Sequence, residues 1–210
     1  MVPCRRSLAA GVLALLLAAA APGHADTLAI VKGSCAACHG EDGNSVAPTF
    51  PKLAGLQVEY LEKQLRDFMT GKRASELMAP AMAALKPADV AALAAYYAAQ
   101  KPQPNTVGDA ALAARGKQIF DDGNTDSGVP ACVGCHQPGG AGNERYPRLA
   151  GQHQAYAAQE MRRFRSGERN NDRARVMRAV AAHERRRDRR RRRVPRGAAV
   201  SGTGVHGGLQ

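Results

Sequence analysis

The sequence lacks several features that define common structural classes. It has five cysteines among 210 residues, and apart from Cys4 all of them lie in two short runs, at 35–38 and 132–135. None is therefore left for a structural disulfide. Beyond residue 25 no apolar run is long enough to cross a bilayer. No stretch alternates apolar and polar residues for long enough to predict a β-strand.

The sequence also lacks a strongly basic body, although its formal charge is +12. The segment from residue 183 onward carries +7 of that charge and residues 1–25 carry +2, which leaves about +3 for the rest. A nearly neutral body does not present the basic face that nucleic-acid binding requires. We therefore expect no nucleic-acid partner.

Residues 1–25 have the features of a secretory signal peptide. A short basic start is followed by an apolar run over residues 8–21, and small residues form a cleavage site that ends at Ala25. The apolar run is too short for a typical membrane span, although an uncleaved N-terminal anchor is the alternative. We expect export to the periplasm with cleavage after Ala25, which also removes Cys4.

The sequence does contain a cysteine–histidine motif twice, as Cys35-Ala36-Ala37-Cys38-His39 and as Cys132-Val133-Gly134-Cys135-His136. A C-x-x-C-H run is the attachment signature of c-type haem. The two thiols form thioethers with the vinyl groups of the porphyrin, and the histidine binds the iron from the proximal side. Two complete runs favour two covalent haem c groups over a zinc site or a dithiol redox pair.

The two motifs lie in two copies of one longer unit. Pro51-Lys52-Leu53-Ala54-Gly55 follows the first motif, and Pro147-Arg148-Leu149-Ala150-Gly151 follows the second. From these prolines to Arg73 and Arg169 the offset between the copies is constant, which indicates a tandem duplication. We expect a domain over 26–100, a proline-containing linker over 101–106, and a second domain over 107–183.

The periodicity within each copy is helical. Apolar residues at helical spacing, with Gly71 and Gly167 as natural stops, predict one long helix in each copy. Pro87 opens a further helix in the first copy. The expected helices span 56–69, 88–100, 109–120 and 152–166. The predicted fold is all-α, with two small helical domains that each wrap around a haem. Such domains bury little apolar surface unaided, so we expect the haem-free chain to fold poorly.

Together these motifs resemble the dihaem cytochromes c4, which consist of two tandem class I cytochrome c domains. The resemblance covers residues 28 to about 182 and rests on the C-x-x-C-H, P-K/R-L-A-G and F-x-x-G-x-R patterns of both copies. It implies an electron-transfer protein, not an enzyme, with one histidine and one methionine on each iron. The proximal ligands would then be His39 and His136. Pro51 and Pro147 match the proline whose carbonyl holds the proximal ring, although a loop-ending role is the alternative.

The distal ligands are less clearly marked. The resemblance places the ligand seven residues before the leucine that leads into the last helix, which favours Met78 over Met82. In the second copy Met177 is the only methionine after the long helix. Met69 and Met161 lie on the apolar faces of the two long helices, so we expect both to be core residues.

The resemblance also implies partners. The donor would be a quinol-oxidising bc complex and the acceptor a terminal oxidase, with outer-sphere transfer between them. The alternative is a cytochrome subunit of a membrane-bound dehydrogenase, since only the partners would differ. A dihaem peroxidase is disfavoured, because it needs an open iron position and two His/Met irons leave none. Peripheral association with the membrane stays open.

The segment 184–210 departs from the repeat. The first copy predicts an alanine-rich helix here, but the sequence has an arginine run over 185–193, broken by Asp188, and then a glycine-rich end. One interpretation is a basic arm that docks on an acidic partner or on anionic lipid.

We favour another interpretation, in which the arginine run is a frame-shifted version of the missing helix. Arginine codons of the form CGN, read one base later, give GNC or GNG, which encode Ala, Val, Asp, Glu or Gly. With third bases chosen freely, the residues from His183 onward can be encoded so that the shifted frame reads MSDAEIAAVAAYLAGLQ and a stop. In that case we expect the arginine tail to be disordered and the second haem to be labile.

Overall fold

The computed structural model describes residues 23–183 of the chain. The expectations for the signal peptide up to residue 22 and for the tail from residue 184 lie outside the described residues. Within them the chain is helical, and its one bridge pairs Asn124 with Val129 outside any strand, so the all-α prediction is confirmed. None of the helices in this part has the length and apolar character that crossing a bilayer requires.

The first copy consists of α1 (Gly23–Ile30), η1 (Val31–Cys35), α2 (Ala36–His39), α3 (Val58–Met69), α4 (Ala79–Ala84) and α5 (Asp89–Ala98). Helix α3 follows Gln57, whose backbone is extended, and ends before Gly71, whose φ of +72° is the left-handed conformation that glycine adopts at low cost. Helix α5 starts later than predicted, because residues 87 and 88 form a turn.

The core of the first copy lies where α5 packs against α1 and α3. One face of α5 supplies four side chains to it, and η1 and α3 supply others. The buried members of this core are Val31, Leu56, Leu61, Leu85, Val90, Leu93, Ala94 and Tyr97. Helix α5 is therefore the element that closes the first copy.

The second copy consists of α6 (Ala110–Asp122), α7 (Val133–His136), η2 (Pro138–Gly140), α8 (Gln154–Ser166) and η3 (Arg173–Arg175), and residues 176–183 are again helical. The side chain of Asp109 caps α6 by accepting a hydrogen bond from the backbone N–H of Leu112 at 2.8 Å. Gly167, in the left-handed conformation with φ of +87°, ends α8 as predicted.

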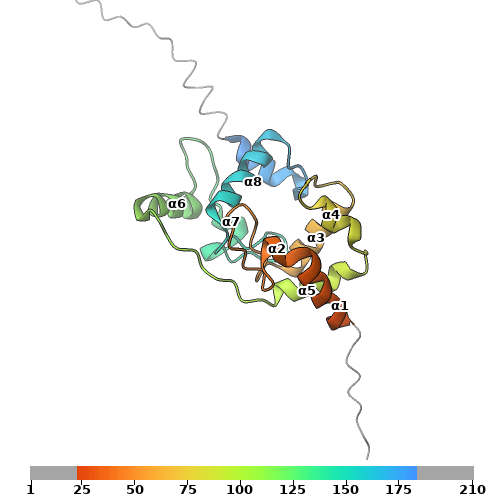
Figure 1. Cartoon of the computed structure of the whole chain (residues 1–210). Helices are drawn as coiled ribbons and strands as arrows, with labels where there is room; N and C mark the ends of the chain where they lie inside the picture. The colour runs from red at the N-terminus through yellow and green to blue at the C-terminus, as the bar shows by residue number, and fades with distance from the viewer. Residues whose placement is uncertain (1–22, 184–210) are drawn as a thin grey trace, which may run out of the picture.

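The second copy buries far less apolar surface than the first among the described residues. Only Phe164 and Ala181 appear there as buried apolar side chains. Helix α6 has no buried residue and lies at the edge of the molecule (Figure 1). Met161 of α8 is 37% exposed, so the expectation that it is a core residue is wrong for the described chain. No described helix lies where α5 lies in the first copy, and the Met161 side chain is therefore only partly covered.

Two candidate haem sites and the interface that joins them

In the first copy one helical turn carries both cysteines of the motif. Cys35 ends η1, and Cys38 and His39 lie in α2, which follows without a break. Residues three positions apart in a helix lie on the same face, so the two thiols point to one side, as two thioethers on one porphyrin edge require. Cys35 is half-buried and Cys38 is exposed.

In the second copy α7 arranges the same residues. Cys132 immediately precedes α7, and its carbonyl accepts hydrogen bonds from the backbone N–H groups of Cys135 at 3.2 Å and His136 at 2.9 Å. Cys132 and Cys135 are both half-buried. All four cysteines of the two motifs are free thiols, so none is used in a disulfide.

The two motif histidines are held in the same way. His39 and His136 are each 6% exposed. Nδ1 of His39 lies 2.9 Å from the carbonyl oxygen of Pro51, and Nδ1 of His136 lies 2.9 Å from that of Pro147. A carbonyl only accepts hydrogen bonds, so Nδ1 carries the proton in both rings and Nε2 keeps a free lone pair for a metal.

Burial also keeps these rings neutral. It lowers the pKa of His39 and of His136 below the ordinary value of 6.5, and the hydrogen bond to a proline carbonyl opposes the shift only in part. Neutral imidazole is the form that binds iron. An aromatic ring stands edge-on to each histidine: Phe50 at 6.4 Å between centroids in the first copy, and Tyr146 at 5.9 Å in the second.

The loop between histidine and proline is folded by one repeated contact. The carbonyl of Gly43 accepts hydrogen bonds from two backbone N–H groups of the P-K-L-A-G segment, at 2.7 and 3.2 Å. The carbonyl of Gly140 accepts the equivalent pair, at 2.8 and 3.0 Å. Both glycines have positive φ, 73° and 70° respectively. The loop therefore brings each proline back to its histidine through backbone contacts around a glycine with positive φ.

The methionines are placed differently from one another. Met78 is half-buried and immediately precedes α4, whereas Met82 lies inside α4 and packs against the core of the first copy. Met69 also packs against this core, as expected. Met177 is half-buried and follows Ala174 and Arg175, two non-glycine residues with positive φ of 51° and 61°.

The donor sets fit haem c better than zinc. Each copy offers two thiols on one face, one imidazole with Nε2 free, and a thioether on a separate segment. A histidine and a methionine bind haem iron from opposite faces of the porphyrin, so the two are not expected to touch. Zinc needs about four ligands in one cluster. Across residues 23–183 no group of three or more His, Cys, Asp and Glu side chains gathers in a metal-binding arrangement.

The loops that hold the two histidines also form an interface between the copies. The side chain of Gln152 accepts a hydrogen bond from the backbone N–H of Lys52 and donates one to its carbonyl, both at 2.9 Å. The side chain of Gln57 does the same in the other direction, accepting from the N–H of Arg148 at 2.8 Å and donating to the carbonyl of Ala141 at 3.0 Å. Lys52 and Arg148 directly follow the two prolines.

The linker is bound to the same interface. The buried ammonium group of Lys52 donates to the carbonyl of Gln103 at 2.9 Å and to Oδ1 of Asn105 at 2.7 Å. The amide of Asn105 in turn donates to the carbonyls of Gly151 and Gln152, at 3.0 and 2.8 Å. The linker therefore connects both loops and restricts how the copies can move.

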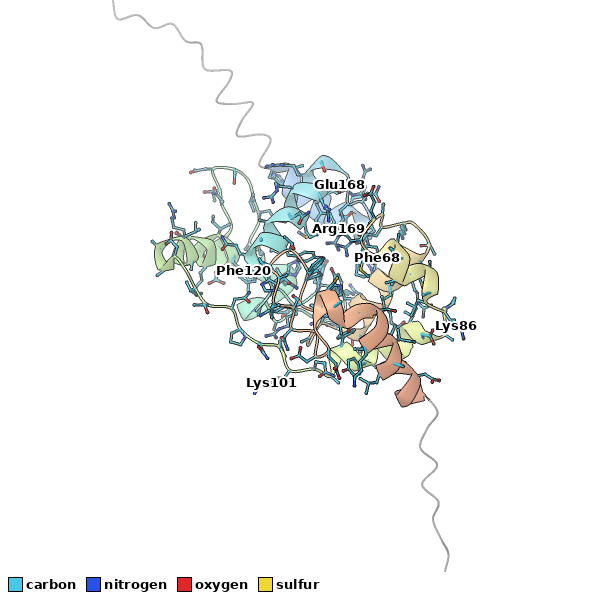
Figure 2. The ribbon with its side chains drawn as sticks, viewed as in Figure 1. Phe68, Lys86, Lys101, Phe120, Glu168 and Arg169 are labelled. Carbon is cyan, nitrogen blue, oxygen red and sulfur yellow. The ribbon has the colours of Figure 1, made fainter. Side chains whose placement is uncertain are left out.

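A buried polar cluster with near two-fold symmetry joins α3 and α8. Arg73 contacts Oε2 of Glu160 at 3.0 Å and Oε1 of Gln64 at 2.8 Å. Arg169 contacts the same two residues, at 2.6 and 3.2 Å. We call Gln64, Arg73, Glu160 and Arg169 the inter-copy cluster. Figure 2 labels Arg169 of this cluster and Phe68 of α3.

Two tyrosines complete the symmetry of the inter-copy cluster. Arg73 donates to the hydroxyl of Tyr156, and Arg169 donates to the hydroxyl of Tyr60, each at 3.1 Å. Each arginine also stacks on a phenylalanine of its own copy, Arg73 on Phe68 at 4.6 Å and Arg169 on Phe164 at 4.5 Å.

One carboxylate serves both arginines of the inter-copy cluster. Burial alone would raise the pKa of Glu160, but the charges of Arg73 and Arg169 overcome it and hold that pKa below the ordinary value of 4.5. Glu160 is 5% exposed and stays ionised at neutral pH. The equivalent residue of the first copy, Gln64, is neutral, so the cluster is symmetric in shape but not in charge.

Sequence reasoning missed the function of this cluster. The repeated tyrosine and arginine positions were visible as part of the duplication, and a polar residue at the same place in both long helices was visible too. What the sequence did not reveal is that each arginine reaches across to the other copy. A polar residue recurring on an otherwise apolar helical face is the signal that could have indicated a second buried surface.

Comparisons with known proteins agree with this geometry. A family model for cytochrome c matches the chain twice, over residues 26–100 and 113–189. Cytochrome c4 of Thiocapsa roseopersicina is 47% identical over 153 residues, which cover 71% of this chain and 79% of that protein. A thiosulfate dehydrogenase electron acceptor of Thiomonas intermedia is 38% identical over 184 residues, which cover 86% of this chain and 84% of that protein.

A solved structure is similar as well. Reduced recombinant cytochrome c4 from Pseudomonas stutzeri matches with a TM-score of 0.70 at 42% sequence identity. The match covers 75% of this chain and 88% of that one. The similarity therefore extends over both copies.

Proposed function

Since the chain belongs to the cytochrome c4 family of dihaem electron-transfer proteins, we propose that it carries electrons from a quinol-oxidising bc complex to a terminal oxidase. The chain binds two covalent haem c groups and is not an enzyme. The haem irons supply the redox chemistry by alternating between the ferric and ferrous states. The protein contributes attachment, axial ligands and a fixed geometry.

We assign these roles to residues as follows. The thioether bonds form at Cys35, Cys38, Cys132 and Cys135. The proximal ligands are His39 and His136, and the carbonyls of Pro51 and Pro147 orient them. The distal ligands are Met78 and Met177. The packing of the partly buried Met82 side chain against the core supports this choice, because that packing engages the side chain away from the segment that precedes α4.

The observation that carries the proposal is the way both proximal sites share one interface. Lys52 and Arg148, which directly follow the two prolines, make backbone contacts to the other copy. The linker and the inter-copy cluster bind the same two halves together. The rate of electron transfer between two centres depends steeply on the distance between them. This interface fixes the two histidines relative to one another.

The proposed location is the periplasm, after removal of residues 1–25. Covalent haem attachment without disulfides is compatible with an exported chain whose cysteines are all used by the haem motifs. Peripheral attachment to the membrane surface would place the protein beside both proposed partners. Fractionation of the periplasm and membranes at low and high salt measures how much is attached.

Reconstitution tests the proposed partners. The purified holoprotein is added to membranes that contain a bc complex and an oxidase but have been washed free of soluble cytochromes. Quinol-dependent oxygen uptake should rise with the amount of protein added and saturate. If uptake does not change while the haems of the protein are reduced and reoxidised by other reagents, the proposed partners are wrong.

A second function is supported by one of the comparisons. The similarity to a thiosulfate dehydrogenase electron acceptor spans 86% of this chain, more than the similarity to the Thiocapsa protein does. The chain could therefore accept electrons from a dehydrogenase instead of a bc complex. Rates of haem reduction by purified thiosulfate dehydrogenase with thiosulfate, and by bc complex with quinol, distinguish the two. The faster donor at equal concentration is the better candidate.

A further inference from the structure

The apolar side of α6 is only partly covered by the described residues. Leu112 is 45% exposed and Ile119 is 40% exposed. Together with Gly116 and Phe120 they recur at helical spacing and form one face. Figure 1 shows α6 at the edge of the molecule, and Figure 2 shows Phe120 near its end. An amphipathic helix with an uncovered face is not stable by propensity alone, since packing supplies most of its stability.

The first copy shows what covers the equivalent helices. There α5 packs against α1 and α3, and Val31 of η1 is 0% exposed. In α5 itself Val90 and Leu93 are 0% and 2% exposed. A porphyrin would lie against equivalent residues in both copies and so would not account for the difference. The missing cover of α6 therefore corresponds to α5.

Other elements of the second copy lack the same cover. Met161 of α8 is 37% exposed, whereas Leu65, its counterpart in α3, packs against the first core. Leu149 is 38% exposed, whereas its counterpart Leu53 packs against that core. Together with α6, three separate segments thus expose apolar side chains. Because their counterparts in the first copy pack on one core, we take Leu112, Ile119, Leu149 and Met161 to border one surface and call them the open face of the second copy.

The residues at the place of α5 in the second repeat are unsuited to this face. Residues 185–193 are arginines apart from Asp188. A guanidinium group stays charged at any physiological pH, and burying it without a partner is costly. The open face offers apolar side chains and no row of carboxylates. The charged sequence of residues 185–193 therefore does not match the apolar open face that a helix at this place would have to cover.

We propose that the open face is the binding site of a helix that the same gene encodes one base out of frame from His183, with the sequence MSDAEIAAVAAYLAGLQ. Aligned with residues 85–101, this sequence places M, I, V, A and L at the positions of Leu85, Val90, Leu93, Ala94 and Tyr97. These are the five positions that the segment from Leu85 to Tyr97 buries in the first copy. Polar S, D and E fall at 86, 87 and 89, none of which is buried. With third bases chosen to give this sequence, the shifted frame can therefore supply an apolar side chain at every buried position.

Two consequences for the 210-residue chain follow from the proposal. Among residues 23–183 no helix closes the second haem site as α5 closes the first, so these residues give the segment that carries Met177 no support from that side. The first site keeps α5 and is closed. The two haems should therefore differ in their access to small ligands such as carbon monoxide, although their proximal sites are alike.

The test begins with the gene and continues with two holoproteins. Sequencing the DNA from codon 183 onward should give codons whose shifted reading matches the apolar and polar pattern of residues 85–97. The 210-residue chain and a chain carrying MSDAEIAAVAAYLAGLQ from position 183 are then compared. Reduced and exposed to carbon monoxide, the 210-residue chain should bind it at one haem of two, and the shifted chain at neither. Far-ultraviolet circular dichroism should show about one more helix in the shifted chain.

Two controls keep the test decisive. A shifted chain with arginine in place of its central I and V should again bind carbon monoxide at one haem, because the helix can no longer cover the open face. Binding of the 210-residue chain to vesicles with and without anionic lipid examines the basic-arm alternative. Codons incompatible with the shifted helix, equal carbon monoxide binding by the two chains, or binding to anionic vesicles without any difference in haem access would each overturn the proposal.

Discussion

The two copies are alike around the proximal histidines and unlike in how they are closed. His39 and His136 have the same exposure and the same hydrogen-bond length to a proline carbonyl. The first copy has a clustered core under α5, whereas α6 in the second has no buried residue. The comparison teaches that a proximal haem site is built by a short loop, and that closing the site requires a separate helix.

The largest expected effect comes from disrupting the core under α5 in the first copy, since the second copy has no such core among the described residues. Leu93→Arg places a charge at a position that is 2% exposed, and should cost at least about 4 kcal/mol in the free energy of unfolding. Leu112→Arg on the exposed face of α6 is the matched control and should cost less than about 0.5 kcal/mol. Denaturant unfolding followed by circular dichroism measures both. Equal losses would mean that α6 is covered after all.

The next largest loss of stability is expected at the inter-copy cluster, which joins the two copies. Glu160→Gln leaves two buried arginines without their carboxylate and should cost about 3 kcal/mol. Glu168→Gln is the control, since the Glu168 side chain is 64% exposed where it pairs with Arg163, and should cost about 0.5 kcal/mol or less. A loss at Glu160 no larger than that at Glu168 would contradict a role for the cluster in joining the copies.

The same variant has a defined pH dependence. Because the pKa of Glu160 is lowered on folding, its contribution is fully present above the unfolded value of about 4.5 and is lost as the pH falls through the lower folded value. The deficit of Glu160→Gln relative to the natural chain should therefore be constant near neutral pH and shrink below about pH 4.5. Thermal unfolding from pH 3 to pH 7 provides the measurement. A deficit that grows as the pH falls would contradict a stabilising role for the ionised carboxylate of Glu160.

Replacing Gly43 or Gly140 by alanine should lower the free energy of unfolding by different amounts in the two copies, although this difference is smaller than the effects above. Both have positive φ, so alanine costs about 1–2 kcal/mol at either position. At Gly43 the added Cβ would also lie 2.8 Å from Tyr97 of α5 and from the backbone of Ala54, whereas at Gly140 its nearest contact is at 3.2 Å. Gly43→Ala should therefore be the more damaging by about 1 kcal/mol. Similar losses would show that α5 can shift without cost.

The smallest effect on stability, with a clear effect on the spectrum, distinguishes Met78 from Met82 in the first copy. Met82→Ala should cost about 1 kcal/mol, because Met82 is a partly buried core side chain, and should leave the sulfur-to-iron charge-transfer band intact. Met78→Ala should remove that band from one haem with little further loss. Met177→Ala should remove it from the other. If Met82→Ala removes the band instead, the ligand assignment is wrong.

Local patterns in the sequence predicted the parts of the fold that depend on local interactions. The long helices were placed by apolar spacing, and Gly71 and Gly167 end them where expected, since left-handed backbone favours glycine. The resemblance to the cytochromes c4 placed a proline carbonyl at each motif histidine, and His39 and His136 each lie 2.9 Å from such a carbonyl although the two His–Pro spacings differ by one residue. Helix α4, which carries Met82, was not predicted, since alanine and proline in a short segment give no clear periodicity.

Contacts between distant segments were not predictable in the same way. The inter-copy cluster depends on which faces of α3 and α8 meet, and neither helix encodes that by itself. Met161 was expected in a core because its helix face is apolar. Burial requires a second element on that face, and a single helix pattern does not reveal whether that element is present.

The most direct test of the contrast between the copies is hydrogen–deuterium exchange on the 210-residue holoprotein. The loops 40–55 and 137–151 should exchange at similar rates, because the same backbone contacts fold both. Amides of α6 should exchange at least about tenfold faster than those of η1 and α5, because α6 is uncovered among the described residues. Equal protection of α6 and α5 would contradict the account.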